Sequence, residues 1–431
     1  MKKALVLSGG GSNGAYQIGA WKALKKLGMK FDMVVGVSIG SMNGAAYAQN
    51  DYRKAKKLWL SLKTTDMFDL DEDIDGKINT YNMKKIFKYV LRGGITYERG
   101  AKHFGKVIKE EKVRKSKIVF GLGTYSLKNQ LPKLVSINEI PRGKLIDYIF
   151  ASCSVYPIIT KKTIDDDDFI DGGFYDNLPI NLAIDMGATE IVAIDLSTIG
   201  LVKRVKDKNI KIDLIKMKKR LKNPLIFNPK DAKELMQEGY FDVMKYFGAI
   251  DGDIYVLKKG SLDKNYNKIK TTYISLLKEI LLSGPKKRIV TEIFNLSRFN
   301  KLFVDIRNDK EITKTVNDSM EYLGELFKID PRKKYSSNYF NYLLLKEVKS
   351  LGYIKLSKGL KGRMLVGHMY NKYKNAKDKE EITKELFNLA LIFPKDFLAT
   401  IYLIAISKKH PLILKSDQFY NDILNLLKEK K

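Results

Sequence analysis

The chain has 431 residues, of which 44% are hydrophobic and 11% aromatic, a globular composition long enough for two or three domains. Its single cysteine, Cys153, excludes an intrachain disulfide. The formal net charge of +30 favours phosphate-bearing partners, either nucleic acid or anionic lipid. The apolar runs at the N-terminus and at 397–406 are shorter than a signal peptide core or a membrane-spanning helix requires, so we expect a cytoplasmic protein.

Strands and helices alternate along the first part of the chain. Short apolar runs predict strands at 3–8, 33–37, 117–122, 133–136, 190–196 and 253–257, and a further strand that ends at residue 170. Apolar residues at three- to four-residue spacing predict helices at 14–27, 38–49, 52–62, 82–91, 100–109, 144–151 and 178–186. This alternation predicts an α/β fold with a mostly parallel sheet and helices packed on it.

The pattern changes after about residue 265. From there on only helical periodicity is visible, and no motif of known chemistry occurs. We therefore expect two domains, a catalytic or binding α/β domain at 1–264 and an all-helical region at 265–431.

The first predicted strand is followed by a glycine-rich loop. Gly9, Gly11 and Gly14 form G-x-G-x-x-G between a strand and a helix, a pattern typical of dinucleotide binding. A nucleotide-dependent oxidoreductase also needs an acidic residue at the end of the next strand. Asp32 lies before that strand, at 33–37, so this alternative lacks its second requirement.

The second predicted strand leads into Gly36-Val37-Ser38-Ile39-Gly40. G-x-S-x-G between a strand and a helix is the nucleophile elbow, a sharp turn that exposes the serine hydroxyl. Side chains two residues before and after Ser38 would collide, which explains Gly36 and Gly40. The helix that follows directs its positive end toward developing negative charge. Ser38 is the candidate nucleophile, against the alternative of a plain tight turn.

A serine nucleophile needs a base. The three histidines, at 103, 368 and 410, do not follow strands of the α/β region, so we expect a carboxylate instead. Asp171 ends an apolar strand and precedes Gly172-Gly173, which permit a sharp turn of the backbone. Taken alone, Asp-Gly-Gly is also a frequent turn sequence.

Together, the glycine loop, the elbow and Asp171-Gly172-Gly173 resemble the patatin-like phospholipase family, in its bacterial form, over roughly 2–196. The segment 151–157, ASCSVYP, resembles another conserved block of that family. The resemblance implies a three-layer fold and a Ser–Asp dyad of Ser38 and Asp171. It also implies an oxyanion hole built from the amides of Gly10 and Gly11. Asn13 departs from the pattern, since the family often has arginine or lysine there.

The activity implied by this resemblance is hydrolysis of a phospholipid or another acyl ester, by a phospholipase A or a lysophospholipase-like esterase that forms an acyl-enzyme and uses no cofactor or metal. The alternative is a catalytically silent protein on the same fold that binds membranes or nucleic acid. Basic and aliphatic residues alternate at 201–222 without aromatic side chains. This mixture favours peripheral docking on an anionic membrane over nucleic-acid binding.

Two acidic segments are predicted to be structural. Residues 71–82 resemble a calcium-binding loop, but the twelfth position is Asn82 where a bidentate glutamate is required, so we expect a polar loop without a metal. The four aspartates at 165–168 are predicted to form a solvated hairpin turn.

Overall fold

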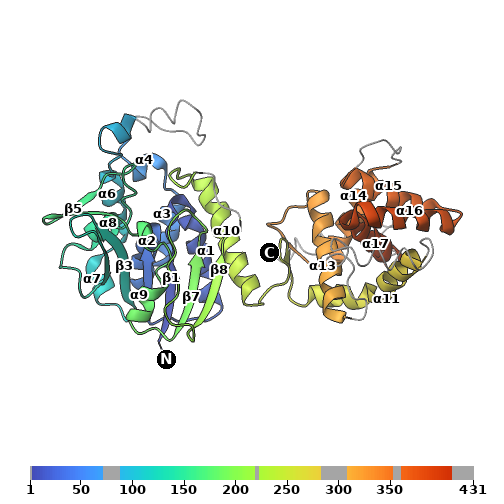
Figure 1. Cartoon of the computed structure of the whole chain (residues 1–431), viewed down its shortest axis with the longest axis horizontal. Helices are drawn as coiled ribbons and strands as arrows, with labels where there is room; N and C mark the ends of the chain where they lie inside the picture. Colours follow the sequence, from blue (N-terminus) through green and yellow to red (C-terminus); the bar gives the residue numbers. More distant parts are fainter. Residues whose placement is uncertain (1, 71–87, 219–222, 283–307, 353–360, 410–431) are drawn as a thin grey trace, which may run out of the picture. The chain divides into compact units, whose positions relative to one another are not determined.

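The computed structural model describes residues 2–70, 88–218, 223–282, 308–352 and 361–409. The chain forms two compact units, Met1–Phe247 and Gly248–Lys431 (Figure 1). The calcium-like segment 71–82 and most of the helix expected at 82–91 lie outside the described residues. Among the described residues, no helix combines the length and the apolar character needed to cross a membrane.

Within its described part, unit 1 contains one eight-stranded sheet. The strand order is β5-β6-β3-β2-β1-β7-β8, and β4 pairs with β3 beside this path. The strands are β1 (Lys3–Leu7), β2 (Met33–Val37), β3 (Val119–Ser126), β4 (Leu131–Ser136), β5 (Lys162–Ile164), β6 (Asp167–Asp171), β7 (Glu190–Asp195) and β8 (Lys211–Lys216). Along the path β3-β2-β1-β7-β8, neighbouring strands pair in parallel. Strands β4 and β6 pair antiparallel with β3, and β5 pairs antiparallel with β6. The prediction of a mostly parallel sheet is confirmed.

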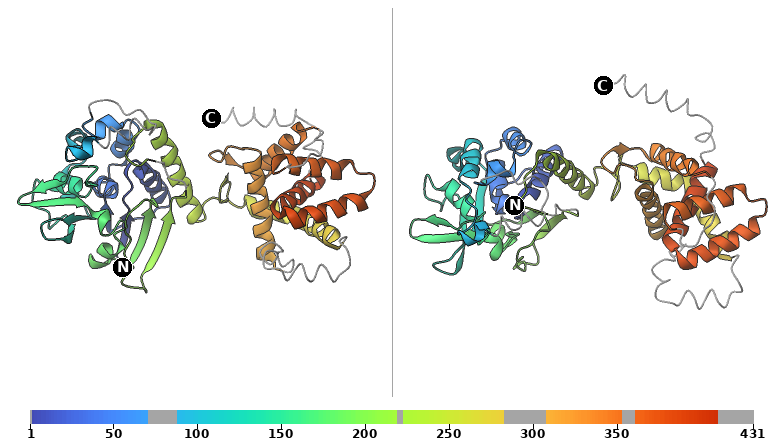
Figure 2. Two further views of the ribbon diagram at one scale, coloured as in Figure 1. Left: turned by 45° about the horizontal axis from the view of Figure 1, so that its top comes forward. Right: turned by 90° about the horizontal axis from the view of Figure 1, so that it is seen from above.

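Helices cover both faces of this sheet (Figure 2). The helices and turns of unit 1 are η1 (Gly11–Gly14), α1 (Ala15–Lys26), α2 (Ile39–Ala48), α3 (Tyr52–Trp59), α4 (Thr64–Met67), α6 (Glu98–Val107), α7 (Glu110–Arg114), α8 (Leu145–Ala151), η2 (Gly172–Phe174), α9 (Ile180–Asp185) and α10 (Pro229–Tyr246). Ala4 and Val6 of β1 share a buried cluster with residues of α9. Leu5 and Leu7 border the same interior space as residues of α1 and α2. This alternation of side chains builds the expected three layers.

Part of the basic segment 201–222 belongs to the sheet. Residues 211–216 form β8, which pairs in parallel with β7 at the sheet edge. Ile215 and Met217 are buried, and Ile212 and Leu214 pack against the cluster beneath α9. The apolar side chains of β8 therefore stabilise the sheet and are not available to a membrane, while docking on a membrane through the rest of the segment stays a prediction. Within 201–218, the part of this segment that the structure describes, the exposed aliphatic residues lie at 201 and 202.

Unit 2 is a helical assembly around α17. Its helices are α11 (Ser261–Leu282), α13 (Asp309–Leu326), α14 (Ser337–Ser350), α15 (Arg363–Asn375), α16 (Lys379–Ile392) and α17 (Pro394–Lys409). Helix α17 packs against the other five helices that the structure describes in this unit. At its centre, Tyr402 donates a hydrogen bond to Asn341 (2.8 Å), and Asn265 donates one to Tyr402 (2.9 Å). The predicted helical character is confirmed for the described residues.

Unit 2 begins earlier than expected and contains a small strand pair. The strand expected at 253–257 as part of the main sheet is instead β9 (Val256–Leu257), which pairs with β10 (Lys334–Tyr335). Tyr255 and Leu257 are buried in the helical core of unit 2. These side chains therefore place the start of unit 2 before the expected boundary at 264/265, which falls inside α11.

Two glycines allow α1 and α10 to pack with their backbones in contact. A Cβ at Gly19 would lie 1.8 Å from the Met236 carbonyl oxygen, and one at Gly239 would lie 2.1 Å from that of Tyr16. Contacts this short against backbone cannot be relieved by a side-chain rotation. Helix α10 is therefore held on the same layer as the glycine loop and α1.

Replacement of Gly239 by alanine should destabilise unit 1 by more than about 2 kcal/mol, because α10 must move away from α1. The measurement is urea unfolding followed by tryptophan fluorescence, since both tryptophans, at 21 and 59, lie in unit 1. The control is Gly105→Ala in α6, where the added Cβ meets nothing within 4 Å. This control should be neutral or stabilising by about 0.5–1 kcal/mol. Equal effects of the two changes would contradict the packing argument.

Candidate active site

Ser38 lies at the junction between β2 and α2 in a strained backbone conformation. Its φ and ψ angles are 55° and −131°, which residues with a Cβ rarely adopt. A Cβ at Gly36 would lie 2.3 Å from the Gly40 carbonyl oxygen, and one at Gly40 would lie 2.3 Å from that of Leu7. The predicted steric reason for both glycines is confirmed, and the segment has the geometry of a nucleophile elbow.

A buried serine outside the predicted site residues, Ser152, holds the elbow in place. The Ser38 N–H donates to Ser152 Oγ (2.8 Å), and the Ser152 hydroxyl donates to the Gly123 carbonyl oxygen (2.6 Å). Ser152 thereby connects the elbow to β3 through buried hydrogen bonds. Its place in the block at 151–157 was the available signal, although the spacing alone did not indicate this contact.

Asp171 is buried at the end of β6 and is held by backbone groups. Its N–H donates to the Ser154 carbonyl oxygen (2.8 Å), and its Oδ1 accepts from the Gly173 N–H (2.7 Å). Gly172 permits this turn, because a Cβ there would lie 2.3 Å from the Gly123 carbonyl oxygen. Within the described part of the chain, Asp171 Oδ2 has no hydrogen bond of full geometry.

The structure brings Ser38 and Asp171 together. Burial raises the pKa of Asp171 to about 6, while the neighbouring Ser38 hydroxyl and the Gly173 N–H lower it. The Ser38 hydroxyl is thus close enough to stabilise the ionised carboxylate, although its contact with Asp171 does not have the full geometry of a hydrogen bond. Catalytic hydrogen bonds are often incomplete before substrate binds and tighten in the complex.

Cys153 lies in the same buried region, beside the hydroxyls of Ser38 and Ser41 and the carboxylate of Asp171. Burial and the nearby Asp171 charge raise the pKa of its thiol well above the usual range. A neutral thiol of this kind packs as a small apolar group. It therefore adds to the desolvation of the carboxylate without adding charge.

The glycine loop presents backbone N–H groups next to the elbow. Gly9 N–H donates to the Asn177 carbonyl oxygen (3.1 Å), and Ser12 N–H donates to that of Pro224 (2.7 Å). Among the described residues, no protein group accepts a hydrogen bond from the N–H of Gly10 or Gly11 between them. Gly11 has φ +56°, and a Cβ on it would lie 2.1 Å from the Pro224 carbonyl oxygen, so this position requires glycine. Gly14 ends η1, where α1 begins.

Asn177 connects the glycine loop to the loop that follows Asp171. Its carbonyl oxygen accepts from Gly9, and its Oδ1 lies where a Cβ on Gly9 or Gly173 would come within 3 Å. Its Nδ2 donates to Thr198 Oγ1 (3.4 Å). This role of Asn177 could not be predicted, because an asparagine soon after Asp-Gly-Gly also suits an ordinary turn.

Asn13, where the family often has a cation, supports the loop itself. It is fully buried, and its Nδ2 donates to the Gly10 carbonyl oxygen (3.2 Å). A second amide, Asn43 of α2, donates to the Gly14 carbonyl oxygen (3.0 Å) and to Gln17 (2.8 Å) and accepts from Trp59 (2.9 Å). Asn43 thereby joins α1, α2 and α3 through buried hydrogen bonds.

The residues of the competing interpretations lie elsewhere. Asp32 accepts a hydrogen bond from the Lys3 N–H (2.8 Å) at the start of β1 and β2, at the opposite end of these strands from the glycine loop. It cannot contact a ribose beside that loop. His103 Nδ1 contacts the Arg99 carbonyl oxygen of its own helix (3.2 Å), His368 lies in α15 of unit 2, and His410 lies outside the described residues.

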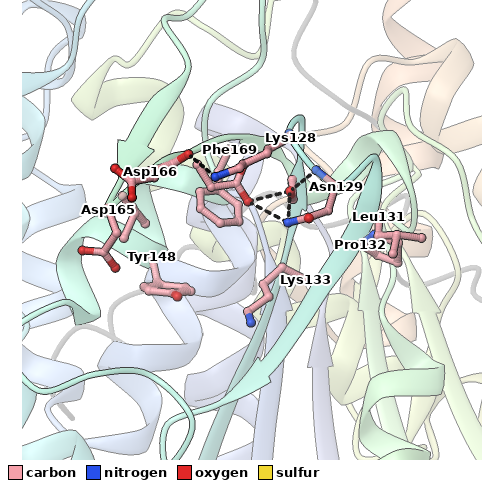
Figure 3. Close-up of a pocket in the computed structure, with 12 residues that line it drawn as sticks. Lys128, Asn129, Leu131, Pro132, Lys133, Tyr148, Asp165, Asp166 and Phe169 are labelled. Atoms are coloured by element: carbon pink, nitrogen blue, oxygen red, sulfur yellow. Dashed lines mark hydrogen bonds between the residues drawn. The ribbon is translucent and has the colours of Figure 1, made fainter.

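A separate hollow of about 510 Å³ opens between β4 and the β5–β6 hairpin (Figure 3). Lys128, Leu131 and Tyr148 line it together with Asp165, whose φ of 53° turns the predicted hairpin. None of the predicted site residues lines this hollow. The aspartates beside it serve as local hydrogen-bond acceptors; for example, Asp167 accepts from Ser126 (2.6 Å).

Comparison with known families agrees with this geometry. Residues 5–184 match the patatin-like phospholipase family, and the match includes the glycine loop, the elbow and Asp171-Gly172-Gly173. This segment belongs to the patatin-like phospholipase family. The family match thus runs from β1 into α9 and ends before β7, β8 and α10, although β7 and β8 belong to the same sheet. We call unit 1 the patatin-like domain.

Curated relatives cover the same part of the chain. The domain is similar to "Lysophospholipase NTE1" of Mycosarcoma maydis, with 26% identity over 204 residues, covering 46% of this chain and 10% of the relative. It is also similar to "Lysophospholipase nte1" of Aspergillus terreus, with 30% identity over 201 residues, covering 45% of this chain and 12% of the relative. The chain thus matches about a tenth of these fungal proteins. The bacterial form of the family stays a prediction.

Among solved structures, VipD from Legionella pneumophila aligns over 94% of this chain and 91% of its own, with a TM-score of 0.37 and 13% identity. A similarity at this level carries no argument about unit 2 or about function.

Asp171→Asn should stabilise the patatin-like domain by about 2–3 kcal/mol at neutral pH. The folded-state pKa of about 6 lies above the value in the unfolded chain, so ionisation costs stability as pH rises from about 4, and the full cost is present above about pH 6. Asparagine keeps an acceptor for the Gly173 N–H without that charge. The measurement is the thermal midpoint at about pH 8 and at about pH 4, and the gain should vanish at the lower pH.

The control is Asp168→Asn on the same strand, where Lys161 and Thr163 lower the pKa of the aspartate. This change at a partly exposed aspartate should not raise the midpoint at either pH. A gain in the control equal to that of Asp171→Asn would contradict the desolvation argument.

Proposed function

We propose that this protein is a lipid acyl hydrolase that uses Ser38 as nucleophile and Asp171 as general base. One observation supports this assignment most directly. In a domain of the patatin-like phospholipase family, a serine on a strained elbow contacts a buried carboxylate whose pKa is raised to about 6. A carboxylate with this pKa is ionised at neutral pH and is more basic than an ordinary aspartate.

In the first half of the reaction, Ser38 Oγ attacks the ester carbonyl carbon, and its proton passes to Asp171 Oδ2. The carbonyl oxygen becomes an oxyanion, for which the N–H groups of Gly10 and Gly11 and the N-terminus of α2 are the proposed donors. The carbon–oxygen bond to the leaving alcohol then breaks, and Asp171 returns the proton to that alcohol. The product is an acyl ester of Ser38.

In the second half, a water molecule attacks the acyl carbon and gives a proton to Asp171. Collapse of the second oxyanion breaks the bond to Ser38 Oγ, which takes the proton back, and the fatty acid leaves. The buried Asp171 can perform both transfers because Gly173 and the strand end hold it in one orientation.

The proposed substrate is a phospholipid or a lysophospholipid. The family match and the names of the curated relatives support this class of ester. The net charge of +30 supports binding to an anionic lipid surface. Asn13, which supports the glycine loop and carries no charge, is not proposed as a phosphate ligand.

Ser38→Ala and Asp171→Asn should each lower kcat by a factor of about 10³ or more, because each removes a group that forms or breaks a bond in the transition state. The measurement is fatty-acid release from mixed phospholipid vesicles and from a simple soluble acyl ester. The control Asp168→Asn should stay within about twofold of the wild type. Equal background turnover by all these proteins would instead indicate a catalytically silent binding protein.

The pH profile of kcat/KM for the soluble ester should fall tenfold per pH unit below about 6, because the base must be ionised to accept the Ser38 proton. The fall begins near pH 6 because the pKa is raised. With an ordinary aspartate as base, kcat/KM would not change until the pH fell to about 4. A profile that is flat between about pH 4 and 7 would contradict a general base with a raised pKa.

A further inference from the structure

Exposed apolar side chains border the candidate active site. Ile199 is 98% exposed, Leu201 60% and Val202 55%, on a loop between β7 and β8, and Phe174 is 48% exposed directly after Gly173. We call these four residues the apolar rim. Single exposed apolar residues are ordinary on protein surfaces, but three within four consecutive positions at a site mark a contact surface.

Backbone hydrogen bonds attach the apolar rim to the catalytic loops. Leu201 N–H donates to the Gly173 carbonyl oxygen (3.1 Å), and the Leu201 carbonyl oxygen accepts from Asn177 N–H (2.5 Å). Nearby, Thr198 Oγ1 donates to the Gly9 carbonyl oxygen (2.9 Å). The rim, the loop after Asp171 and the glycine loop are therefore parts of one hydrogen-bonded unit.

Cations follow the apolar residues immediately. Lys203 lies over the ring of Tyr175, with its ammonium nitrogen 4.2 Å from the ring centre. The backbone N–H of Lys203 donates to Asp176 Oδ1 (3.3 Å). Exposed Arg204 and Lys206 come next, and Lys206 pairs with Asp185. Apolar tips beside lysine and arginine are the composition of segments that lie at the boundary between lipid headgroups and acyl chains.

We propose that the apolar rim inserts into the surface of an anionic phospholipid bilayer and so places Ser38 at the lipid. The choice of lipid rests on the proposed function, but insertion does not require turnover. Four side chains fall well short of the roughly 20 residues per side in a stable protein interface, whereas they suffice for shallow insertion beside cations. The basic charge of the chain complements the anionic headgroups.

The test uses a tryptophan placed on the rim. Both native tryptophans are buried, so they should respond little to a membrane. Ile199→Trp in the Ser38→Ala background adds an exposed tryptophan whose fluorescence reports on the rim. The probe is a vesicle of phosphatidylcholine and phosphatidylglycerol with brominated acyl chains. The proposal expects a blue shift and at least about twofold quenching at position 199. The matched control, Leu131→Trp, reports on a residue that is 62% exposed on β4 and should show neither change.

A second pair of variants measures affinity. Ile199→Glu should weaken binding to the same vesicles by more than about tenfold, because charge at the tip opposes insertion. Leu131→Glu should change the affinity by less than about twofold, since it adds the same charge away from the rim. Equal losses in both would mean that net charge alone explains binding, which overturns the proposal.

Other outcomes separate the hypotheses. Vesicle binding without quenching at position 199, or no binding at all, overturns the insertion proposal. A blue shift without vesicles that disappears on dilution, with a dimer seen by sedimentation, identifies the rim as a contact between two copies and also overturns it. Quenching at position 199, together with wild-type turnover equal to that of Ser38→Ala, sinks the proposed hydrolase and leaves insertion standing.

Discussion

The desolvation of the Asp171 carboxylate is the constraint on which the site depends. Burial raises its pKa to about 6, which makes it a stronger base and at the same time costs folding free energy at neutral pH. The surrounding structure offsets that cost with apolar burial elsewhere and with a single backbone donor, Gly173. More donors would stabilise the carboxylate and weaken it as a base, so the sparse hydrogen bonding at Oδ2 is consistent with the proposed role.

Close backbone contacts make this arrangement possible. At Gly36, Gly40 and Gly172, a side chain would collide with the carbonyl oxygen of a neighbouring segment. The elbow, the turn after Asp171 and the sheet therefore approach one another more closely than residues with side chains permit. Buried polar side chains then fix the register, as Ser152 does between the elbow and β3. The strained Ser38 conformation persists because these contacts determine it from several sides.

Much of the patatin-like domain could be predicted from its sequence, because each motif there imposes a local geometry that few alternatives satisfy. G-x-S-x-G after an apolar strand indicated the elbow, and Asp-Gly-Gly indicated the turn. The roles of Ser152 and Asn177 could not be predicted, since each depends on segments far apart in the chain. The prediction for the basic segment 201–222 was incomplete because a two-sided strand rich in lysine has the same composition as a membrane-binding stretch. The boundary before unit 2 depended on which core takes up Tyr255 and Leu257, which periodicity does not reveal.

The position of β8 gives the lysines of this stretch a further consequence. It is the last strand in the sheet order, so its outer side offers backbone groups to which another strand could pair. Exposed Lys211 and Lys216 stand at its two ends. Charged side chains on an outer strand oppose edge-to-edge association between copies, because pairing would bring like charges together and desolvate them. Part of the excess positive charge is thereby explained by protection of an open sheet against aggregation, independently of any lipid.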